Sequence, residues 1–157
     1  MPDMQVCPCQ SQRAYADCCQ LFHVQQKFPS FAEELMRSRY SAYVFQDIGY
    51  IVKTTVPSQQ ELLDAADMLT WSRETEWLGL DVLNHVPDIG KNHAQVEFIA
   101  HFQNGGEVRH HHELSAFVKI GGRWYFIDPT VLLPAMKQPC ICGPDKKFKA
   151  CCGQFFK

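Results

Sequence analysis

Residues 94–106 read Ala94-Gln-Val-Glu-Phe-Ile-Ala-His-Phe-Gln-Asn-Gly-Gly106, and this stretch decides the fold of the 157-residue chain. Apolar side chains occupy every second position from Ala94 to Phe102. That period of two is typical of a β-strand with one buried face. The Asn-Gly-Gly run is a strong signal for a tight hairpin, because glycine adopts the positive φ angles that short turns require. The stretch therefore predicts a strand, a turn and a returning antiparallel strand.

The flanking sequence extends this hairpin into a sheet. We predict a returning strand over residues 108–119, a turn at the Gly-Gly pair 121–122 and a last strand over residues 124–127. Upstream, alternating apolar residues predict a strand over residues 77–82, and residues 87–92 have the composition of a turn. The expected sheet is a meander of about four antiparallel strands.

The segment before the sheet has the apolar spacing of helices. We predict helices over residues 32–46, 50–55 and 58–71. Ser30 and Ser58 are the expected N-caps of the first and the third helix, since each is followed three residues later by a glutamate. Helices followed by a strand meander define an α+β fold, in which a curved sheet wraps around the N-terminal helices.

The parity of the strand pattern predicts the face on which a pocket would lie. With a two-residue turn, even-numbered residues before the turn share a face with odd-numbered residues after it. Phe98 then lies on the face that carries His111, Glu113 and Ser115. A surface that joins apolar and polar side chains in this way is typical of a ligand cavity. A three-residue turn would send the polar side chains to solvent instead, and the sequence leaves both registers open.

Residues 35–40 read Leu-Met-Arg-Ser-Arg-Tyr and place two arginines on the first helix. We expect one of them, Arg37 or Arg39, to reach the same pocket, where its planar guanidinium would pair with Glu113 or with a bound anion, and Arg37 is the candidate. The alternative for this arginine is a surface salt bridge to Glu33 or Glu34.

All eight cysteines lie in two clusters near the ends of the chain, and both clusters have the spacing C-x-C-x8-C-C. The clusters consist of Cys7, Cys9, Cys18 and Cys19, and of Cys140, Cys142, Cys151 and Cys152. Four thiolates are the ligand set of a closed, structural zinc site, so we expect up to two Zn²⁺ ions per chain. The adjacent cysteines leave open whether all four bind one ion, because neighbouring side chains in an extended chain point apart.

Two alternatives use the same cysteines. Disulfides would suit an exported chain, and an iron–sulfur cluster also takes four thiolates. However, residues 1–6 have neither the basic start nor the apolar core of a signal peptide, and no apolar run approaches the length of about 18 residues that a membrane span requires. We expect a cytoplasmic protein without a membrane span, and in that reducing compartment clustered thiols indicate metal binding.

The charge of the chain is unevenly distributed. The formal net charge is -2, so no global field attracts nucleic acid or membrane. Residues 140–157 nevertheless contain four lysines and one aspartate, and a basic tip is formed by Lys146, Lys147, Phe148 and Lys149. We expect this tip to bind a protein partner with an acidic surface. The alternative for Phe148, and for Tyr15 at the matching position of the other cluster, is to pack beneath its own metal loop. Nucleic-acid binding by the lysines and the interleaved phenylalanine is the less favoured alternative, because the rest of the chain is negative.

The C-terminal cluster resembles a known zinc-binding motif. Residues 140–152 follow the pattern Cys-x-Cys-Gly-x-x-Lys-Lys-Phe-Lys-x-Cys-Cys, which is similar to the SEC-C motif at the C-terminus of the preprotein translocase motor SecA. In that motor the motif docks on the acidic face of the export chaperone SecB. The N-terminal copy departs further from the motif, with Gln10 in place of the glycine and only Arg13 from the basic run.

Two such copies around this middle segment resemble the bacterial YchJ-like family. The segment contains Leu35-Met-Arg-Ser-Arg-Tyr40 and Trp77-Leu-Gly-Leu80. The resemblance covers nearly the whole chain, and it implies a nuclear transport factor 2-like (cystatin-like) fold but no particular activity. The expected domains are a SEC-C-like knuckle over residues 1–22, the central domain over 23–136 and a SEC-C knuckle over 137–157.

These observations favour a zinc-binding protein-interaction module over an enzyme. The alternative is a small-molecule-binding protein, or an enzyme of the hydrolase or isomerase type, in which His111 and Glu113 act as an acid/base pair in the central pocket. We expect no catalytic residue, because polar side chains on a half-exposed strand are the rule. The fold itself does not decide between the two functions.

Overall fold

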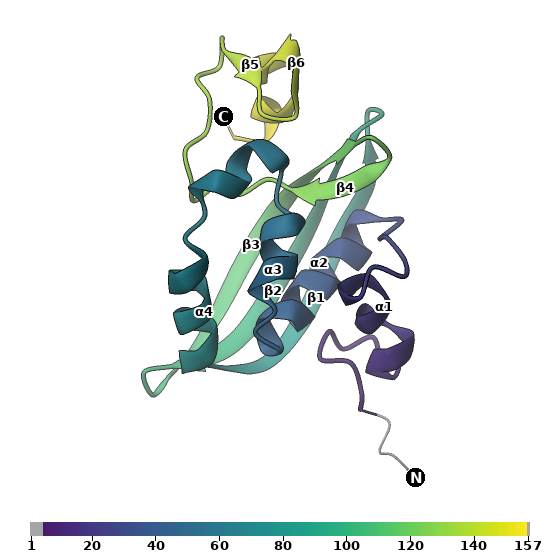
Figure 1. The fold of residues 1–157 in the computed structure, drawn as a ribbon, viewed down its shortest axis with the longest axis vertical. Helices are drawn as coiled ribbons and strands as arrows, with labels where there is room; N and C mark the ends of the chain where they lie inside the picture. The colour runs from purple at the N-terminus through teal and green to yellow at the C-terminus, as the bar shows by residue number, and fades with distance from the viewer. Residues whose placement is uncertain (1–4, 157) are drawn as a thin grey trace.

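The computed structural model describes residues 5–156 and contains a four-stranded antiparallel sheet with helices on one face (Figure 1). The strands follow the chain in the order β1 (Thr75–Ile89), β2 (His93–Asn104), β3 (Glu107–Ile120) and β4 (Arg123–Phe126). A small ribbon of β5 (Pro139–Cys140) and β6 (Gly143–Lys147) forms one end of the molecule. The predicted α+β fold and its strand meander are confirmed, although β1 extends well beyond the predicted strand.

Most of the helical segments precede the sheet, as the sequence predicts. They are η1 (Tyr15–Asp17), α1 (Cys19–His23), α2 (Ala32–Val44), α3 (Ile48–Lys53), η2 (Pro57–Leu62) and α4 (Ala65–Glu74), and the C-terminal end adds η3 (Phe148–Ala150) and η4 (Cys152–Phe155). Helices α2 and α3 agree with the first two predicted helices within two residues at each end. Helix α2 packs against β1, β2 and β4 and carries most of the helical side of the core.

The third predicted helix is wrong as a continuous element, because the structure divides it into η2 and α4. Leu63 between them is extended (φ −84°, ψ 136°). Asp64 then begins α4, since its carboxylate accepts a hydrogen bond of 3.0 Å from the backbone N–H of Asp67. Ser58 is not a helix cap, because its hydroxyl donates to the carbonyl of Ile141 at 2.7 Å, 83 positions away.

The predicted cap of the first helix is also displaced. Phe31 is the N-cap residue of α2 and makes no side-chain capping bond. The backbone N–H of Ser30 instead donates to the carboxylate of Glu34 at 2.8 Å. A glutamate therefore does secure the start of this helix, but it lies one position later than the sequence pattern indicates.

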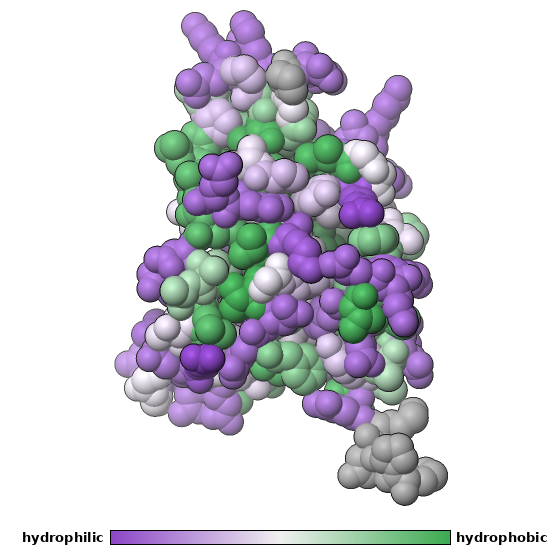
Figure 2. Space-filling model, viewed as in Figure 1, coloured by the Kyte–Doolittle hydropathy of each residue, from purple (hydrophilic) through white to green (hydrophobic). Residues whose placement is uncertain are grey.

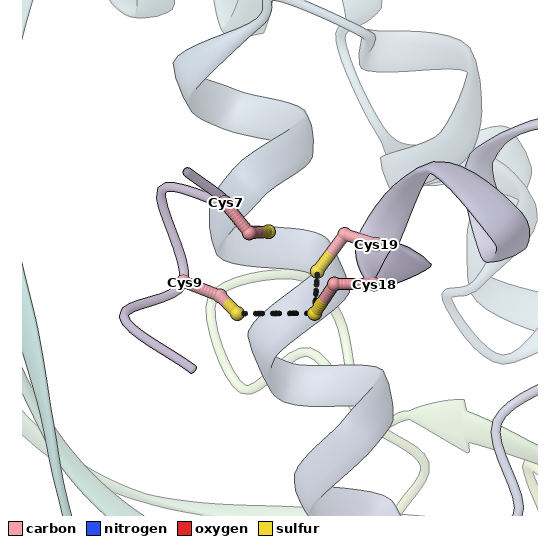
Figure 3. A group of neighbouring side chains, drawn as sticks. All are labelled: Cys7, Cys9, Cys18 and Cys19. Atoms are coloured by element: carbon pink, nitrogen blue, oxygen red, sulfur yellow. Dashed lines mark hydrogen bonds between the residues drawn. The ribbon is translucent and has the colours of Figure 1, made fainter. Parts of the chain in front are cut away.

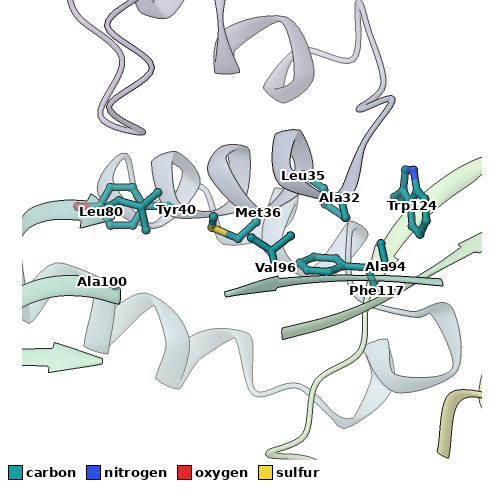
Figure 4. Packing of buried hydrophobic residues seen from close by; sticks show 10 residues of the cluster. All are labelled: Ala32, Leu35, Met36, Tyr40, Leu80, Ala94, Val96, Ala100, Phe117 and Trp124. Atoms are coloured by element: carbon teal, nitrogen blue, oxygen red, sulfur yellow. The ribbon is translucent and has the colours of Figure 1, made fainter. Parts of the chain in front are cut away.

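The main hydrophobic core lies between α2 and the sheet (Figure 4). The α2 contribution comes from positions at helical spacing, namely Ala32, Leu35, Met36 and Tyr40. The sheet contributes Leu80, Ala94, Val96, Ala100, Phe117 and Trp124. Burying each large apolar side chain contributes about 1.5–3 kcal/mol to the free energy of folding. The packing of this layer therefore holds α2 in its position on the sheet.

The hairpin between β2 and β3 has the two-residue turn that produces the predicted parity. Asn104 pairs with Glu107, and the two glycines between them have φ angles of 62° and 82°. Both angles lie in the left-handed region, where a side chain would introduce strain. Phe98 consequently pairs with Glu113. His111, Glu113 and Ser115 therefore lie on the helix-covered face of the sheet.

Candidate functional site

The four sulfur atoms of the N-terminal cluster converge on one point (Figure 3). All of them lie within 4.8 Å of one another, and the cysteines are at most 4% exposed. The sulfur of Cys18 lies 3.7 Å from that of Cys9 and 3.9 Å from that of Cys19. A tetrahedral zinc site with Zn–S bonds of about 2.3 Å has sulfur–sulfur edges of about 3.8 Å. The spacing of the sulfurs therefore fits a tetrahedral metal ion.

The C-terminal cluster has the same geometry. The sulfur of Cys142 lies 3.6 Å from that of Cys140 and 3.5 Å from that of Cys151, and all four sulfurs are within 4.8 Å of one another. All eight cysteines are free thiols, and each group of four could hold a metal ion. The two clusters lie toward opposite ends of the molecule, one beside α1 and the other at the β5–β6 ribbon (Figure 1).

One backbone conformation explains how adjacent cysteines reach the same point. Cys18 has φ −128° and ψ −114°, and Cys151 has φ −135° and ψ −113°. Each of these residues is the N-cap of a short helix that begins with the second cysteine of the pair. This conformation is neither extended nor helical, and it turns both sulfurs toward the C-x-C pair. The sequence copies therefore have matching structures.

The thiols of each cluster differ in acidity because they share protons. Hydrogen bonds from Cys19 and Cys9 hold the pKa of Cys7 far below its ordinary value, whereas the pKa values of Cys9 and Cys19 are raised. At the other end, burial and the neighbouring thiols raise the pKa of Cys142 to about 12. Four buried thiolates repel one another, and a bound cation would offset this repulsion. Each cluster is therefore suited to a positive ion.

Contacts with α2 and β1 anchor the N-terminal cluster. The guanidinium of Arg37 donates from Nη1 to the carbonyl of Cys9 at 2.6 Å and from Nε to Glu33 at 3.1 Å. The side-chain oxygen of Gln10 accepts from the backbone N–H of Leu80 at 3.0 Å. Arg37 therefore does not reach the central pocket, and this part of the prediction is corrected: its surface alternative, the salt bridge to Glu33, is present.

The C-terminal cluster is seated on the end of the sheet. Phe148 is 1% exposed and packs with Val56, Ala116, Val118 and Ile127. The prediction that Phe148 contacts a partner is therefore wrong, because its ring is part of the interior that supports the cluster. Lys146, Lys147 and Lys149 on either side of it are exposed.

A cavity of about 360 Å³ lies between the helices and the sheet. The predicted pocket residues Phe98, His111, Glu113 and Ser115 all line it. The Glu113 carboxylate accepts a hydrogen bond from the Ser115 hydroxyl, and one of its oxygens lies 3.1 Å from Nε2 of His111. The structure thus brings together the three polar residues of β3 that the strand parity places on this face.

Arg39, and not Arg37, is the arginine that lines this cavity. Arg39 is 8% exposed and stacks over the ring of Phe126, with 4.3 Å between its guanidinium carbon and the ring centroid. Its Nη1 donates to the carbonyl of Ile51 at 2.9 Å and to the hydroxyl of Thr54 at 2.7 Å. Helical spacing was the available signal, because Arg39 lies four positions after the buried Leu35.

Two family models match this chain. The model of the YchJ middle NTF2-like domain matches residues 31–129, and the SEC-C motif model matches residues 5–21. Because the first match covers more than half of the sequence, the chain belongs to the YchJ-like family of NTF2-like proteins.

Curated relatives match over nearly their full length. A UPF0225 protein of Haemophilus influenzae (strain PittEE) is 57% identical over 149 residues, which are 95% of this chain and 92% of the relative. A UPF0225 protein of Actinobacillus succinogenes is 52% identical over 150 residues, which are 96% of this chain and 97% of the relative.

Two solved structures share the fold. A SEC-C motif containing protein from Psychrobacter arcticus is 46% identical, with a TM-score of 0.90 and coverage of 97% of both chains. RPA3114, a SEC-C motif containing protein from Rhodopseudomonas palustris, is 40% identical, with a TM-score of 0.72 over 79% of this chain and 96% of its own. None of the helices in residues 5–156 has the length and apolar character that crossing a bilayer requires.

Proposed function

We propose that each cysteine cluster holds one Zn²⁺ ion and that the C-terminal knuckle docks on an acidic surface of a protein partner. The knuckle consists of residues 137–157. Zinc is the preferred ion because closed sites of four cysteines are its usual structural sites, and because the sulfur–sulfur distances of 3.5–3.9 Å match its tetrahedron. A reducing compartment such as the cytoplasm would keep these thiols available for the ion.

The exposed lysines of the knuckle are the observation that supports docking. Lys146, Lys147 and Lys149 are exposed, whereas Asp145 is the one acidic residue between Cys140 and Cys152. The end of the molecule formed by β5 and β6 projects hydrophilic side chains in Figure 2. The N-terminal cluster offers only Arg13 at the corresponding positions, so the proposal assigns docking to the C-terminal knuckle.

The proposed docking depends on the metal. All three lysines lie in the loop between Cys142 and Cys151, whose sulfurs are 3.5 Å apart. An ion that joins these sulfurs closes the loop and fixes where the lysines point. Without the ion, the negative cysteine thiolates would repel one another, and nothing would hold the two ends of the lysine loop together.

The test is affinity capture from a bacterial lysate with quantitative mass spectrometry. The baits are the unaltered chain, the triple charge reversal Lys146→Glu, Lys147→Glu and Lys149→Glu, and the cluster variants Cys142→Ser and Cys9→Ser. A matched control carries Lys27→Glu, Lys53→Glu and Arg73→Glu, which change the net charge equally at exposed positions outside the knuckle.

We expect acidic proteins to be captured by the unaltered chain, by the control and by Cys9→Ser. The same proteins should be lost with the knuckle charge reversal and with Cys142→Ser. A captured set that is identical for all baits would contradict the docking function, because neither the lysines nor the C-terminal cluster would then contribute to it.

A further inference from the structure

The central cavity has the size and composition of a small-molecule site. Its volume of about 360 Å³ is within the range of about 300–1,000 Å³ that such sites occupy. Large aromatic side chains line much of it, including Tyr43, Trp71, Trp77, Phe98 and Phe102. Trp71 and Trp77 meet edge to face with 5.3 Å between ring centroids, and Nε1 of Trp77 is buried without a hydrogen-bond partner in residues 5–156.

Arg39 brings an unpaired positive charge to this cavity. Every hydrogen bond that its guanidinium makes within residues 5–156 uses Nη1. No carboxylate in the same part of the chain lies within 4.0 Å of it. Its Nε and Nη2 groups make no hydrogen bond within residues 5–156, and they belong to a residue that lines the cavity.

A buried cation with open donors is a binding site for an anion. Burial lowers the pKa of the Arg39 guanidinium, and the more distant charges of Asp128 and Glu113 only partly offset that effect. A ligand carboxylate on the open edge of Arg39 would form the paired hydrogen bonds that this planar group favours. The bonds of Nη1 to the end of α3 hold the guanidinium in place for that contact.

Two carboxylates line the same cavity and restrict which anions fit. Glu113 is held by Ser115 and His111, and one oxygen of Asp128 accepts from the backbone N–H and the hydroxyl of Thr130. The second oxygen of Asp128 has no hydrogen-bond partner in residues 5–156. A simple anion would gain from Arg39 but would be repelled by both carboxylates. A ligand that also carries a positive group would pair with Arg39 through its anionic group and would attract the carboxylates through its cationic group.

We propose that the central cavity binds a free amino acid with an aromatic side chain as its zwitterion. The ligand carboxylate binds Arg39, and its ammonium group faces Glu113 and Asp128. Its ring packs among the aromatic side chains of the cavity wall, chiefly those of Trp71 and Trp77. This proposal does not rest on zinc binding or on docking by the knuckle, because within residues 5–156 none of the cavity residues hydrogen-bonds to a cysteine of either cluster.

The test uses three ligands that share a phenylethyl unit and measures their Kd by isothermal calorimetry and tryptophan emission. L-Phenylalanine carries both charged groups, 3-phenylpropanoate has only the carboxylate, and 2-phenylethylamine has only the ammonium group. We expect phenylalanine to bind tightest. Each of the other two should bind about tenfold more weakly or worse, because a charge-assisted hydrogen bond is lost.

Matched variants test which side chain of the protein contacts each charged group of the ligand. Glu113→Gln should weaken phenylalanine by about tenfold and leave 3-phenylpropanoate unchanged or tighter, because the variant removes a repulsion. Glu97→Gln is the control, since Glu97 pairs with His112 on the opposite face of the sheet. Arg39→Gln should abolish the binding of phenylalanine and of 3-phenylpropanoate, because both ligands carry a carboxylate. If that variant does not fold, the comparison of Glu113→Gln with Glu97→Gln still decides the matter.

Three results would overturn the proposal. The first is that phenylalanine fails to bind at millimolar concentration. The second is that all three ligands bind equally well, which would mean that the cavity does not distinguish their charges. The third is that Glu113→Gln and Glu97→Gln have the same effect on phenylalanine.

Discussion

The side chain of His93 contacts the C-terminal cysteine cluster from the end of β2. Its Nε2 atom lies 3.3 Å from the sulfur of Cys152 and 3.8 Å from the sulfur of Cys151, although the sequence separates His93 from Cys152 by 59 positions. The imidazole is 8% exposed and packs against Phe155, with 5.2 Å between ring centroids. The sheet thus supplies a partner for the sulfurs that neither of the repeated cysteine motifs contains.

Replacing His93 should weaken metal binding at one end of the molecule only. Groups that hydrogen-bond to metal ligands typically contribute about 10–100-fold to metal affinity. We therefore expect His93→Ala to release zinc from the C-terminal cluster about 10–100-fold more readily in a chelator competition. The N-terminal cluster is the internal control, because His93 does not contact it. Equal zinc retention by His93→Ala and the unaltered chain would show that this contact does not support the ion.

Gly153→Ala should disturb the C-terminal knuckle. A Cβ atom at this position would lie 2.5 Å from the carbonyl oxygen of Phe148 and 2.8 Å from its ring, so the backbone has to move. Overpacking of this kind costs about 1–3 kcal/mol, and we expect earlier loss of zinc from this end during denaturant unfolding.

Gly49→Ala is the matched control for that substitution. Gly49 lies in α3, and a Cβ atom there meets only the Asp47 side chain at 3.7 Å, an ordinary contact. Alanine should stabilise this helix by about 0.5–1 kcal/mol. A stabilising effect of Gly153→Ala would contradict the tight packing of the knuckle.

Leu35→Ala should destabilise the central domain strongly. Leu35 is 0% exposed in the core between α2 and the sheet, and removing such a side chain costs about 2–5 kcal/mol in the free energy of unfolding. Leu132→Ala is the control, because Leu132 is 79% exposed and should change stability by less than about 0.5 kcal/mol. Both values come from chemical denaturation monitored by circular dichroism, and equal effects would contradict the position of the core.

Local patterns in the sequence were sufficient to predict the sheet. The alternation from Ala94 to Phe102 and the Asn-Gly-Gly run predict a strand and a turn, but they leave two registers open. The pairing of Asn104 with Glu107 selects the register of the two-residue turn, in which Glu113 lies beside Phe98. The cysteine spacing likewise predicted both clusters, because all four ligands of each cluster come from one short segment.

The remaining features depend on contacts between distant segments. The cap pattern of Ser58 is overridden by its bond to Ile141, which belongs to the C-terminal knuckle. Arg37 and Arg39 have the same chemistry and lie two positions apart, and only the packing of α2 decides which of them enters the cavity. Phe148 has two interpretations in the sequence, partner contact or packing beneath its loop, and its burial against the sheet selects the second. Single-sequence reasoning cannot recover such contacts.

Elemental analysis of protein purified under reducing conditions is the decisive measurement for the two cysteine clusters. The account predicts two zinc ions per chain, one for each cluster of four free cysteines. It also predicts one ion in Cys142→Ser and one in Cys9→Ser. Protein that is folded, fully reduced and free of metal at both ends would contradict the account.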